Sequence, residues 1–243
     1  MANPALLDKT TKTLAADSTC TSVMTRRGVL ESLGVFVAIM FISGAIGWGV
    51  MASRLNSPSI GLLMWVPLLA AFALSFVIMR HPRTAKWLGA VYALLEGFIL
   101  GGISAWYNVQ YHGIVGEAIG STLGVALVVW FLYGSGLVKV TNKTYRVVLF
   151  ATMGAMAFYA VSIVSMLFGG PNLDGSSGVV GIVVSLVLAA LAAANLLIDF
   201  DRVDKMIAVG VEAEYEWYMA FAMVLAIVWL YLEILNVLGK MRR

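Results

Sequence analysis

Seven long apolar runs dominate this chain of 243 residues and decide what it can fold into. Each run has about 20 residues, the length that an α-helix needs to cross the hydrocarbon core of a bilayer. The runs are continuous and lack the alternation of apolar and polar residues that marks barrel strands, so helices are expected. They occupy residues 32–52, 60–79, 87–107, 118–138, 147–168, 178–198 and 217–238.

The composition agrees with this interpretation, because 61% of the residues are hydrophobic and only 12% are charged. Both values lie outside the usual range of soluble domains. The sequence therefore predicts an all-α integral membrane protein with seven transmembrane helices. Residues 1–29 are polar and small and are expected to be a disordered or interfacial tail, and residues 30–243 are expected to form the seven-helix transmembrane domain.

Basic residues alternate along the loops and predict the topology. They gather before the first run and in the second, fourth and sixth loops: Lys9, Lys12, Arg26, Arg27; Arg80, Arg83, Lys86; Lys139, Lys143, Arg146; Arg202, Lys205. The positive-inside rule places these segments and the N-terminus in the cytoplasm. Lys240, Arg242 and Arg243 break the pattern, so the last run either crosses fully or dips in and returns. Its length favours a full crossing.

Several classes of function are not expected. The net charge of +3 is explained by the cytoplasmic ends, and a basic stripe with interleaved aromatics is missing, so we expect no nucleic-acid partner. No phosphate loop, zinc motif or serine and histidine pair at matching depth suggests an enzyme, and no cofactor is expected. Cys20 is the only cysteine, which excludes an internal disulfide. Tryptophans near the span ends, including Trp229, are expected in an interfacial aromatic belt.

Glu96 lies inside the third run, about 15 Å from its cytoplasmic end. A carboxyl group at that depth has to face other helices, and two roles stay open. It is either a protonated packing group or part of an ion or proton path. Gly97, Gly101 and Gly102 follow with the small-residue spacing that lets a neighbouring helix approach closely.

Two further acids lie at or within later runs. Asp199 closes the sixth run, and Asn195 lies one turn before it on the same helix face, which makes Asn195 a second candidate for the path. Glu233 lies inside the seventh run. The turn between these runs is expected near residues 208–213, which would place Glu233 about 15 Å deeper than Asp199. Glu214 and Glu216 are therefore alternative partners of Asp199.

Three short motifs, taken in order, resemble the transmembrane Bax-inhibitor-motif family, in particular its bacterial branch. They are LLEGFILGGIS in the third run, LLIDFDRVD at the end of the sixth and WLYLEILN in the seventh. The resemblance covers roughly residues 25–243. It implies seven helices with the last one surrounded by the other six, and a location in the bacterial inner membrane.

The resemblance also implies a function, because several members of that family behave as pH-sensitive calcium leak channels. By motif, the proton-sharing acids would be Asp199 and Glu233, which would also bind calcium transiently. The arginine latch would be Arg80, in VIMRHPR. Partners would then be the calcium ion and the lipid bilayer.

Two other functions stay open. The chain could instead regulate other membrane proteins, such as a membrane-bound protease, with its N-terminal tail carrying the interaction. A secondary transporter would show an inverted repeat with broken helices, and no such repeat is visible.

Overall fold

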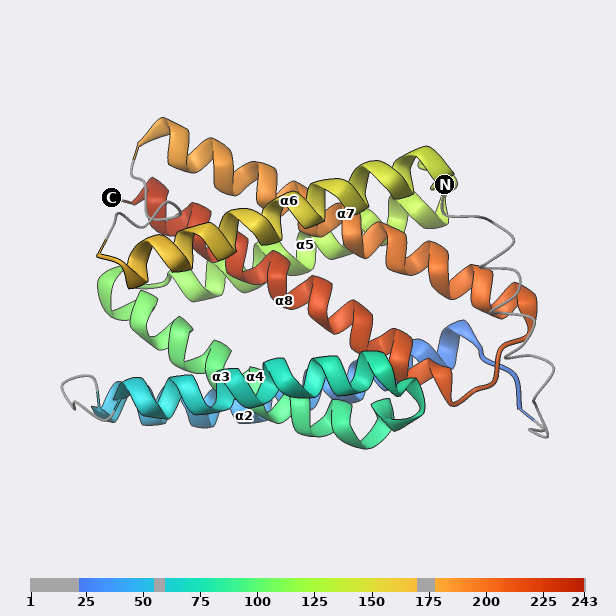
Figure 1. Cartoon of the computed structure of the whole chain (residues 1–243), viewed down its shortest axis with the longest axis horizontal. Coiled ribbons are helices and arrows are strands. Elements are labelled where there is room, and N and C mark those ends of the chain that lie inside the picture. The colour runs from blue at the N-terminus through green and yellow to red at the C-terminus, as the bar shows by residue number, and fades with distance from the viewer. Residues whose placement is uncertain (1–21, 55–59, 170–177, 243) are drawn as a thin grey trace. The chain divides into compact units, whose positions relative to one another are not determined.

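The structure is a computed structural model that describes residues 22–54, 60–169 and 178–242. In this part of the chain the regular structure is helical, except for an isolated antiparallel bridge between Val23 and Glu212. The elements, labelled as in Figure 1, are α2 (Arg26–Arg54), α3 (Ile60–Arg80), the 3-10 helix η1 (Pro82–Thr84), α4 (Ala85–Gln110), α5 (Ile114–Gly134), α6 (Asn142–Leu167), α7 (Val179–Val209) and α8 (Tyr215–Met241).

Each predicted apolar run corresponds to one of these long helices. Within the described residues, six helices are long and apolar enough to cross a membrane, namely α2 and α4 to α8. The apolar segment of α3, Met64–Arg80, is shorter, so a crossing at α3 stays a prediction. α7 continues to Val209, beyond the apolar run that ends at residue 198 and up to the predicted turn. Its last turns carry acidic and basic residues, which are typical of a helix end that is exposed to water.

Local sequence explains where two of the helices begin and end. Thr141 caps α6, because its hydroxyl accepts a hydrogen bond from the Thr144 N–H at 3.2 Å. α7 ends in a Schellman motif at Gly210, which has a φ of 77° that glycine adopts without strain. The N–H of Val211 donates to the Met206 carbonyl there. The predicted turn near residues 208–213 is thus confirmed.

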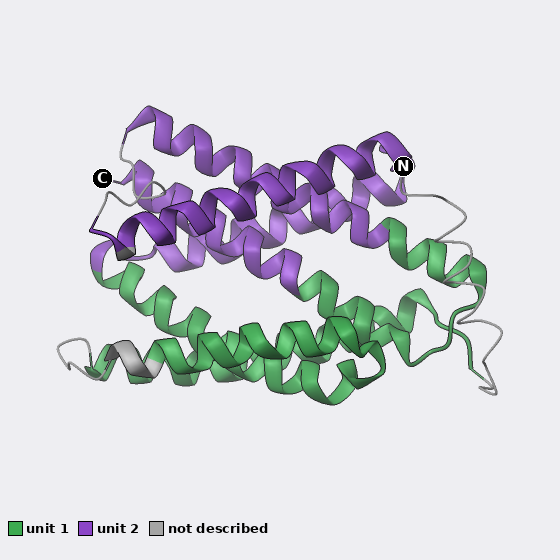
Figure 2. Cartoon of the chain, in the orientation of Figure 1, with its two compact units in different colours: residues 1–109, 201–224 green, residues 110–200, 225–243 purple. Residues whose placement is uncertain are grey.

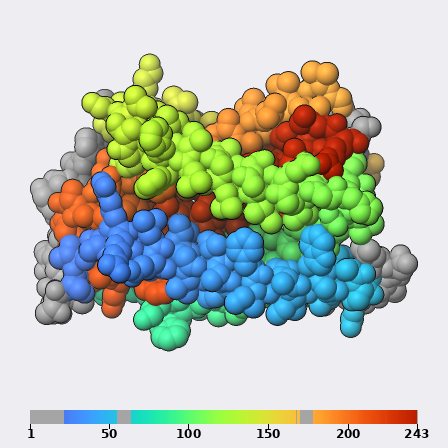
Figure 3. All heavy atoms as spheres, turned by 180° about the vertical axis from the view of Figure 1, so that it is seen from behind, coloured from blue at the N-terminus to red at the C-terminus, as the bar shows by residue number. Residues whose placement is uncertain are grey.

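Large apolar side chains lie exposed along the helices. Phe41 and Ile42 on α2 expose 59% and 65% of their surface, and the same holds for Leu127 on α5 and Phe150 on α6. Figure 3 shows the side chains of α2 as a continuous band, coloured blue to cyan. Contiguous apolar surface of this extent is unfavourable in water, so the protein is a multi-pass membrane protein with lipid against these helices.

The chain divides into two compact units, coloured separately in Figure 2. Unit 1 contains residues 1–109 and 201–224, and unit 2 contains residues 110–200 and 225–243. Both α7 and α8 contribute one part to each unit. Residues 1–21 of the predicted tail lie outside the described part of the chain, and the expected single domain of residues 30–243 stays a prediction.

The core of unit 1 is built on a close crossing of α2 and α4. A side chain at Gly101 would overlap the backbone of Gly44, and one at Gly47 would overlap the backbone of Phe98. The prediction that glycines in the third run admit a neighbouring helix is confirmed, and the neighbour is α2. Aromatic contacts add to this core, with Tyr92 on α4 packing edge-on against Phe221 on α8 at a centroid distance of 5.0 Å.

The helices α4 and α8 are the most buried of the candidate spans. In each, 56% of the most apolar window is buried, against 17% to 33% in the other candidate spans of the described chain. Leu230 and Leu235 on α8 expose 1% and 0% of their surface. This burial makes α4 and α8 the helices best shielded from lipid, and acids that must avoid lipid are found on both.

Candidate functional site

Glu233 is a buried carboxylate in unit 2 with aromatic hydrogen-bond donors around it. It exposes 3% of its surface. Its Oε1 accepts a hydrogen bond from the phenol of Tyr159 on α6 and another, at 3.1 Å, from the indole Nε1 of Trp229 on α8. These donors satisfy an acceptor that water cannot reach, and they hold the carboxyl group in one orientation.

Asp199 and Asn195 lie on the part of α7 that belongs to unit 2, as the sequence predicts for neighbours one turn apart. Asp199 is buried, with 6% of its surface exposed. The amide Nδ2 of Asn195 donates to the Thr152 hydroxyl on α6 and to the Leu191 carbonyl, both at 2.9 Å. Asn195 therefore ties α7 to α6 and presents its amide to the interior of the unit.

The relative level of the two acids follows from a contact between α7 and α8. Lys240 on α8 donates to the hydroxyl of Ser185 on α7 at 2.7 Å, which places these two residues side by side. From there, with a rise of about 1.5 Å per residue, Glu233 lies about 10 Å along α8 and Asp199 about 21 Å along α7. The two acids are thus offset by about 10 Å along the helices, and a direct pairing between them stays a prediction.

Glu96 lies in unit 1 and is buried on α4, with 9% of its surface exposed. The side chain of Tyr92, one turn earlier, hydrogen-bonds to it. Next to it, Gly97 packs against Ser43 and the backbone of Met40 on α2. These contacts place Glu96 in the tightly packed α2–α4 crossing. Both open roles, packing group and path residue, stay predictions.

The predicted latch, Arg80, is exposed at the end of α3 in unit 1, and its engagement with Asp199 or Glu233 stays a prediction. Three residues later, Arg83 forms ion pairs with Glu212 at 3.4 Å and with Glu214 at 3.8 Å, in the turn before α8. The Glu212 carboxylate raises the pKa of Arg83 above its ordinary value. Arg83 therefore stays charged and holds the loop before α4 to the α7–α8 turn.

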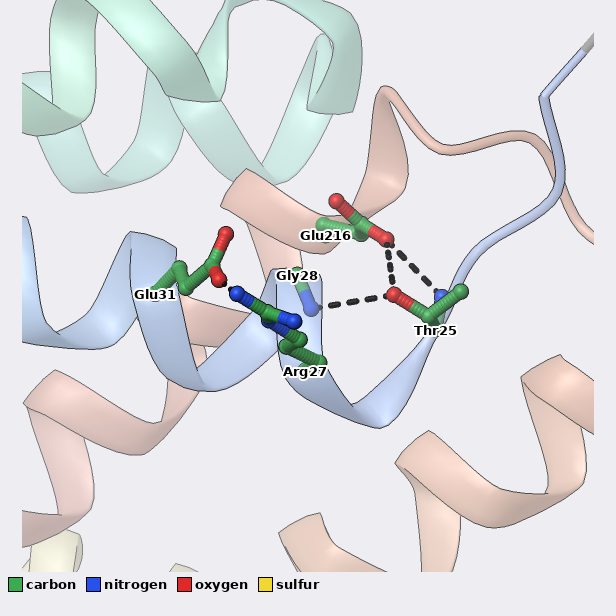
Figure 4. A network of polar contacts seen from close by, with 5 residues as sticks. All are labelled: Thr25, Arg27, Gly28, Glu31 and Glu216. Carbon is green, nitrogen blue, oxygen red and sulfur yellow. Dashed lines mark hydrogen bonds and ion pairs between the residues drawn. The ribbon is translucent and has the colours of Figure 1, made fainter.

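Glu216, the other alternative partner of Asp199, is engaged with the N-terminal end of α2 (Figure 4). Its Oε1 accepts from the Thr25 N–H at 2.8 Å and from the Thr25 hydroxyl at 3.1 Å. The same hydroxyl accepts from the Gly28 N–H at 3.0 Å, which makes Thr25 the cap of α2. A side chain at Gly28 would overlap the Glu216 carboxylate. Pairing of Glu214 or Glu216 with Asp199 stays a prediction.

The backbone before α2 continues this attachment. The Met24 N–H donates to the Val211 carbonyl at 2.8 Å, and the Ala213 N–H donates to the Ser22 carbonyl at 3.2 Å. Arg26 then forms a bidentate pair with Asp204, with distances of 2.6 and 2.8 Å. We call residues 22–28 with these partners the N-terminal clasp. It belongs entirely to unit 1.

Sequence reasoning missed the donors that surround Glu233. Trp229 was assigned to an interfacial belt, and that assignment was incomplete because its indole N–H serves a buried acid. The spacing of four residues between Trp229 and Glu233 is a signal that could have found it. Tyr159 lies 74 positions away in the chain and carries no such signal.

The arrangement provides buried carboxylates that could attract a cation. Within the described residues, no group of three or more histidine, cysteine, aspartate or glutamate side chains could hold a metal ion. A tightly held calcium ion takes six to eight oxygen ligands. Transient calcium binding at Asp199 and Glu233 remains a prediction, and it is the kind of weak binding that an ion path requires.

Comparison with known proteins identifies a family. A family model described as Bax inhibitor 1 like matches residues 3–243. No curated protein matches the chain. No solved structure matches it.

Proposed function

Because this chain belongs to the Bax inhibitor 1-like family, we propose that it is a pH-sensitive calcium leak channel of a bacterial inner membrane. Members of the family are generally membrane proteins without enzymatic activity. The observation that carries the proposal is Glu233, which is buried at 3% exposure and oriented by Tyr159 and Trp229. A membrane helix that places and orients an acid in this way has a use for it.

The mechanism uses two acids that share one low-dielectric region. Asp199 and Glu233 are both buried in unit 2, and two negative charges repel strongly where water is scarce. Ionising one acid therefore disfavours ionising the other, and the pair titrates as a coupled system. Protonation changes the charge of this pair, and in the proposed mechanism that change releases or engages Arg80 as the latch. The ionised carboxylates attract calcium as an ion with hard oxygen ligands.

Tyr159 and Trp229 hold the Glu233 carboxyl group of this site in place. Both donate to the same oxygen of Glu233, so the carboxyl group keeps one orientation. The hydrogen bond between Asn195 and Thr152 holds α7 against α6. A site built from packed helices keeps its geometry while one element, the latch, moves.

The proposal also includes a topology in the membrane. The N-terminus is cytoplasmic, all seven helices cross the membrane, and α8 lies at the centre of the bundle. Two observations support a full crossing by the last helix. α8 is continuous over Tyr215–Met241, and two basic residues at its end have partners, because Arg242 pairs with Glu117 at 2.6 Å and Lys240 bonds Ser185.

A flux measurement tests the proposal. Asp199→Asn and Glu233→Gln each remove a titrating group and retain its shape, so calcium uptake into liposomes should lose most of its dependence on pH. Purified full-length variants are compared across a pH series with a calcium indicator inside the vesicles. Glu31→Gln is the matched control, because Glu31 is exposed on α2 and pairs with Arg27 one turn before it. A wild-type pH profile in both buried variants would show that these acids are not the sensor.

The alternative functions give different results in the same assay. A regulator of other membrane proteins, such as a membrane-bound protease, would pass no calcium when purified alone. A secondary transporter would show uptake that saturates and depends on a second ion. A leak through the purified protein, without a coupling ion, supports the channel.

A further inference from the structure

Lys86 is an exposed basic residue of unit 1 that the proposed mechanism does not use. It is the second residue of α4, and two tryptophan rings hold its ammonium group. Its Nζ lies 5.5 Å from the ring centroid of Trp87, also on α4, and 5.7 Å from that of Trp217 on α8. A lysine ammonium at about 6 Å or less from a ring centroid is attracted to the face of the ring. The charge is therefore kept at one place near the surface by rings from two helices.

The core of unit 1 fixes the ring of Trp217. Phe36 on α2 packs edge-on against it at a centroid distance of 5.4 Å, and Phe36 itself is fully buried. On α4, a side chain at Gly89 would lie 2.6 Å from the Phe36 ring, so the glycine gives that ring its room. Three helices, α2, α4 and α8, thus position the rings around Lys86 before any ligand arrives.

The neighbouring basic residue in the same segment is used differently. Arg83 is paired with Glu212 at 3.4 Å and with Glu214 at 3.8 Å, so its charge is balanced within the protein. Over residues 22–54, 60–169 and 178–242, the contacts of the Lys86 ammonium are with the two rings, which carry no charge. Lys86 can therefore offer its charge and its protons to a ligand.

The three side chains share one kind of hydrogen-bonding chemistry. An ammonium group has three donors and no acceptor, and an indole has one N–H donor and no acceptor. In the described part of the chain, neither indole N–H, of Trp87 or of Trp217, donates to a protein group. Donors that gather around one positive charge fit an anion with several oxygen acceptors, and a phosphate group is such an anion.

The place of these residues in the fold selects a lipid as the source of the phosphate. They lie near the start of a candidate membrane span, Pro82–Gln110, where tryptophans are typical of the headgroup level. Trp87 exposes 74% of its surface, and Val91 and Leu94 are exposed as well. Their spacings of four and three residues put them on one face of α4. An exposed apolar face thus runs from the donors into the span.

We propose that Lys86, Trp87 and Trp217 bind the phosphate headgroup of an anionic phospholipid, whose acyl chains lie against Val91 and Leu94. The inference goes beyond the proposed function, because it concerns a lipid and no step of ion flow. Since the rings come from α4 and α8, the bound lipid joins these two helices. Anionic lipid should therefore stabilise the folded protein.

The test measures this stabilisation with the purified full-length protein in an uncharged detergent. Phosphatidylglycerol should raise the melting temperature to a plateau, and phosphatidylcholine should not. Lys86→Gln should weaken the apparent affinity for phosphatidylglycerol about fivefold, as expected for the loss of one basic residue near a headgroup. Lys86→Arg keeps the charge and should stay within about twofold of the wild type. Trp217→Phe removes one indole donor and should also weaken binding, measured against its own melting temperature without lipid.

Lys143→Gln is the matched control, because Lys143 is likewise an exposed lysine at the second position of a 26-residue helix, α6. It should change the affinity by less than about twofold. Native mass spectrometry of the same samples counts bound lipids, so a variant that melts early can still be judged. Equal affinities of Lys86→Gln and Lys143→Gln, or equal stabilisation by phosphatidylcholine, would overturn the proposal. Equal stabilisation by inorganic phosphate would assign the donors to a free anion and overturn it too. None of these measurements involves calcium, so they leave the proposed function untouched.

Discussion

At the scale of single residues, the buried glutamates Glu96 and Glu233 each have an aromatic donor one turn before them. Tyr92 precedes Glu96, and Trp229 precedes Glu233, each by four residues. Residues with this spacing lie next to each other on a helix. An aromatic side chain brings its donor into an apolar environment together with a large apolar body, which makes it a suitable partner for an acid inside a membrane.

Removing the hydrogen-bond donors of Glu233, Tyr159 and Trp229, should destabilise the protein. Tyr159→Phe and Trp229→Phe each delete one hydrogen bond to the buried Glu233 carboxyl; the first removes only the phenol oxygen, and the second also replaces the indole by a smaller ring. The expected loss is about 1–3 kcal/mol in the free energy of unfolding, because the acceptor stays buried. Unfolding by SDS titration in mixed micelles measures this loss.

The same two substitutions in a Glu233→Gln background form a double-mutant cycle. If the donors act through the carboxylate, their cost should shrink in that background. Trp87→Phe is the matched control, because Trp87 is 74% exposed and should change stability by less than about 0.5 kcal/mol. Equal costs for Trp229→Phe and Trp87→Phe would contradict the importance of the indole hydrogen bond.

At the scale of elements, the close crossing of α2 and α4 depends on glycines, which have no side chain to separate the two backbones. Gly101→Ala would place a methyl group into the backbone of Gly44, and backbone atoms cannot turn aside. The helices would have to separate, at an expected cost of about 1–3 kcal/mol or more. A thermal unfolding series in detergent measures it.

Gly124→Ala on α5 is the control for that crossing, because no atom lies within 4 Å of the added methyl group among the described neighbours. It should be neutral within about 0.5 kcal/mol. Gly101→Ala with the same stability as Gly124→Ala would show that α2 and α4 do not pack closely in the membrane.

At the scale of the whole molecule, unit 1 is closed by contacts between distant parts of the chain. Thr25 and Glu216 are 191 positions apart. Gly28→Ala should push the flexible Glu216 carboxylate away and break its hydrogen bonds to Thr25, at a cost of about 1 kcal/mol. Hydrogen exchange at the Thr25 amide should then become severalfold faster.

The control for Gly28→Ala is Gly34→Ala, which is also on α2. A methyl group at Gly34 meets no described atom within 4 Å. It should leave exchange at Thr25 unchanged. Identical exchange in both variants would mean that the N-terminal clasp does not depend on Glu216.

Much of the fold could be predicted from the sequence, because membrane helices are set by local properties. A run of about 20 apolar residues requires a helix wherever it occurs, and Gly210 marks the end of α7 by its own backbone preference. The buried state of Glu96, Asp199 and Glu233 followed from the cost of exposing an acid to lipid. These arguments need no knowledge of neighbouring helices.

The partners of these residues could not be predicted, because they depend on which helices meet. Nothing in the sequence pairs Tyr159 with Glu233 or Arg83 with Glu212. The apolar run ends at residue 198, and the polar last turns of α7, up to Val209, gain their support from ion pairs such as Arg26 with Asp204. Such contacts join segments that are far apart in the chain, and the local sequence of one segment does not indicate which other segment it will contact.

The divided composition of unit 1 has a consequence for biogenesis. Residues 22–109 leave the ribosome long before residues 201–224, which carry the acceptors described above for Thr25 and Arg26 of the N-terminal clasp. α2 therefore enters the bilayer before the chain that contains Asp204 and Glu216, the acceptors of Arg26 and Thr25, has been synthesised. Unit 1 is completed only when the final helical hairpin has been inserted, so a nascent chain that stalls before α8 would expose an unfinished core to the quality-control proteases of the membrane.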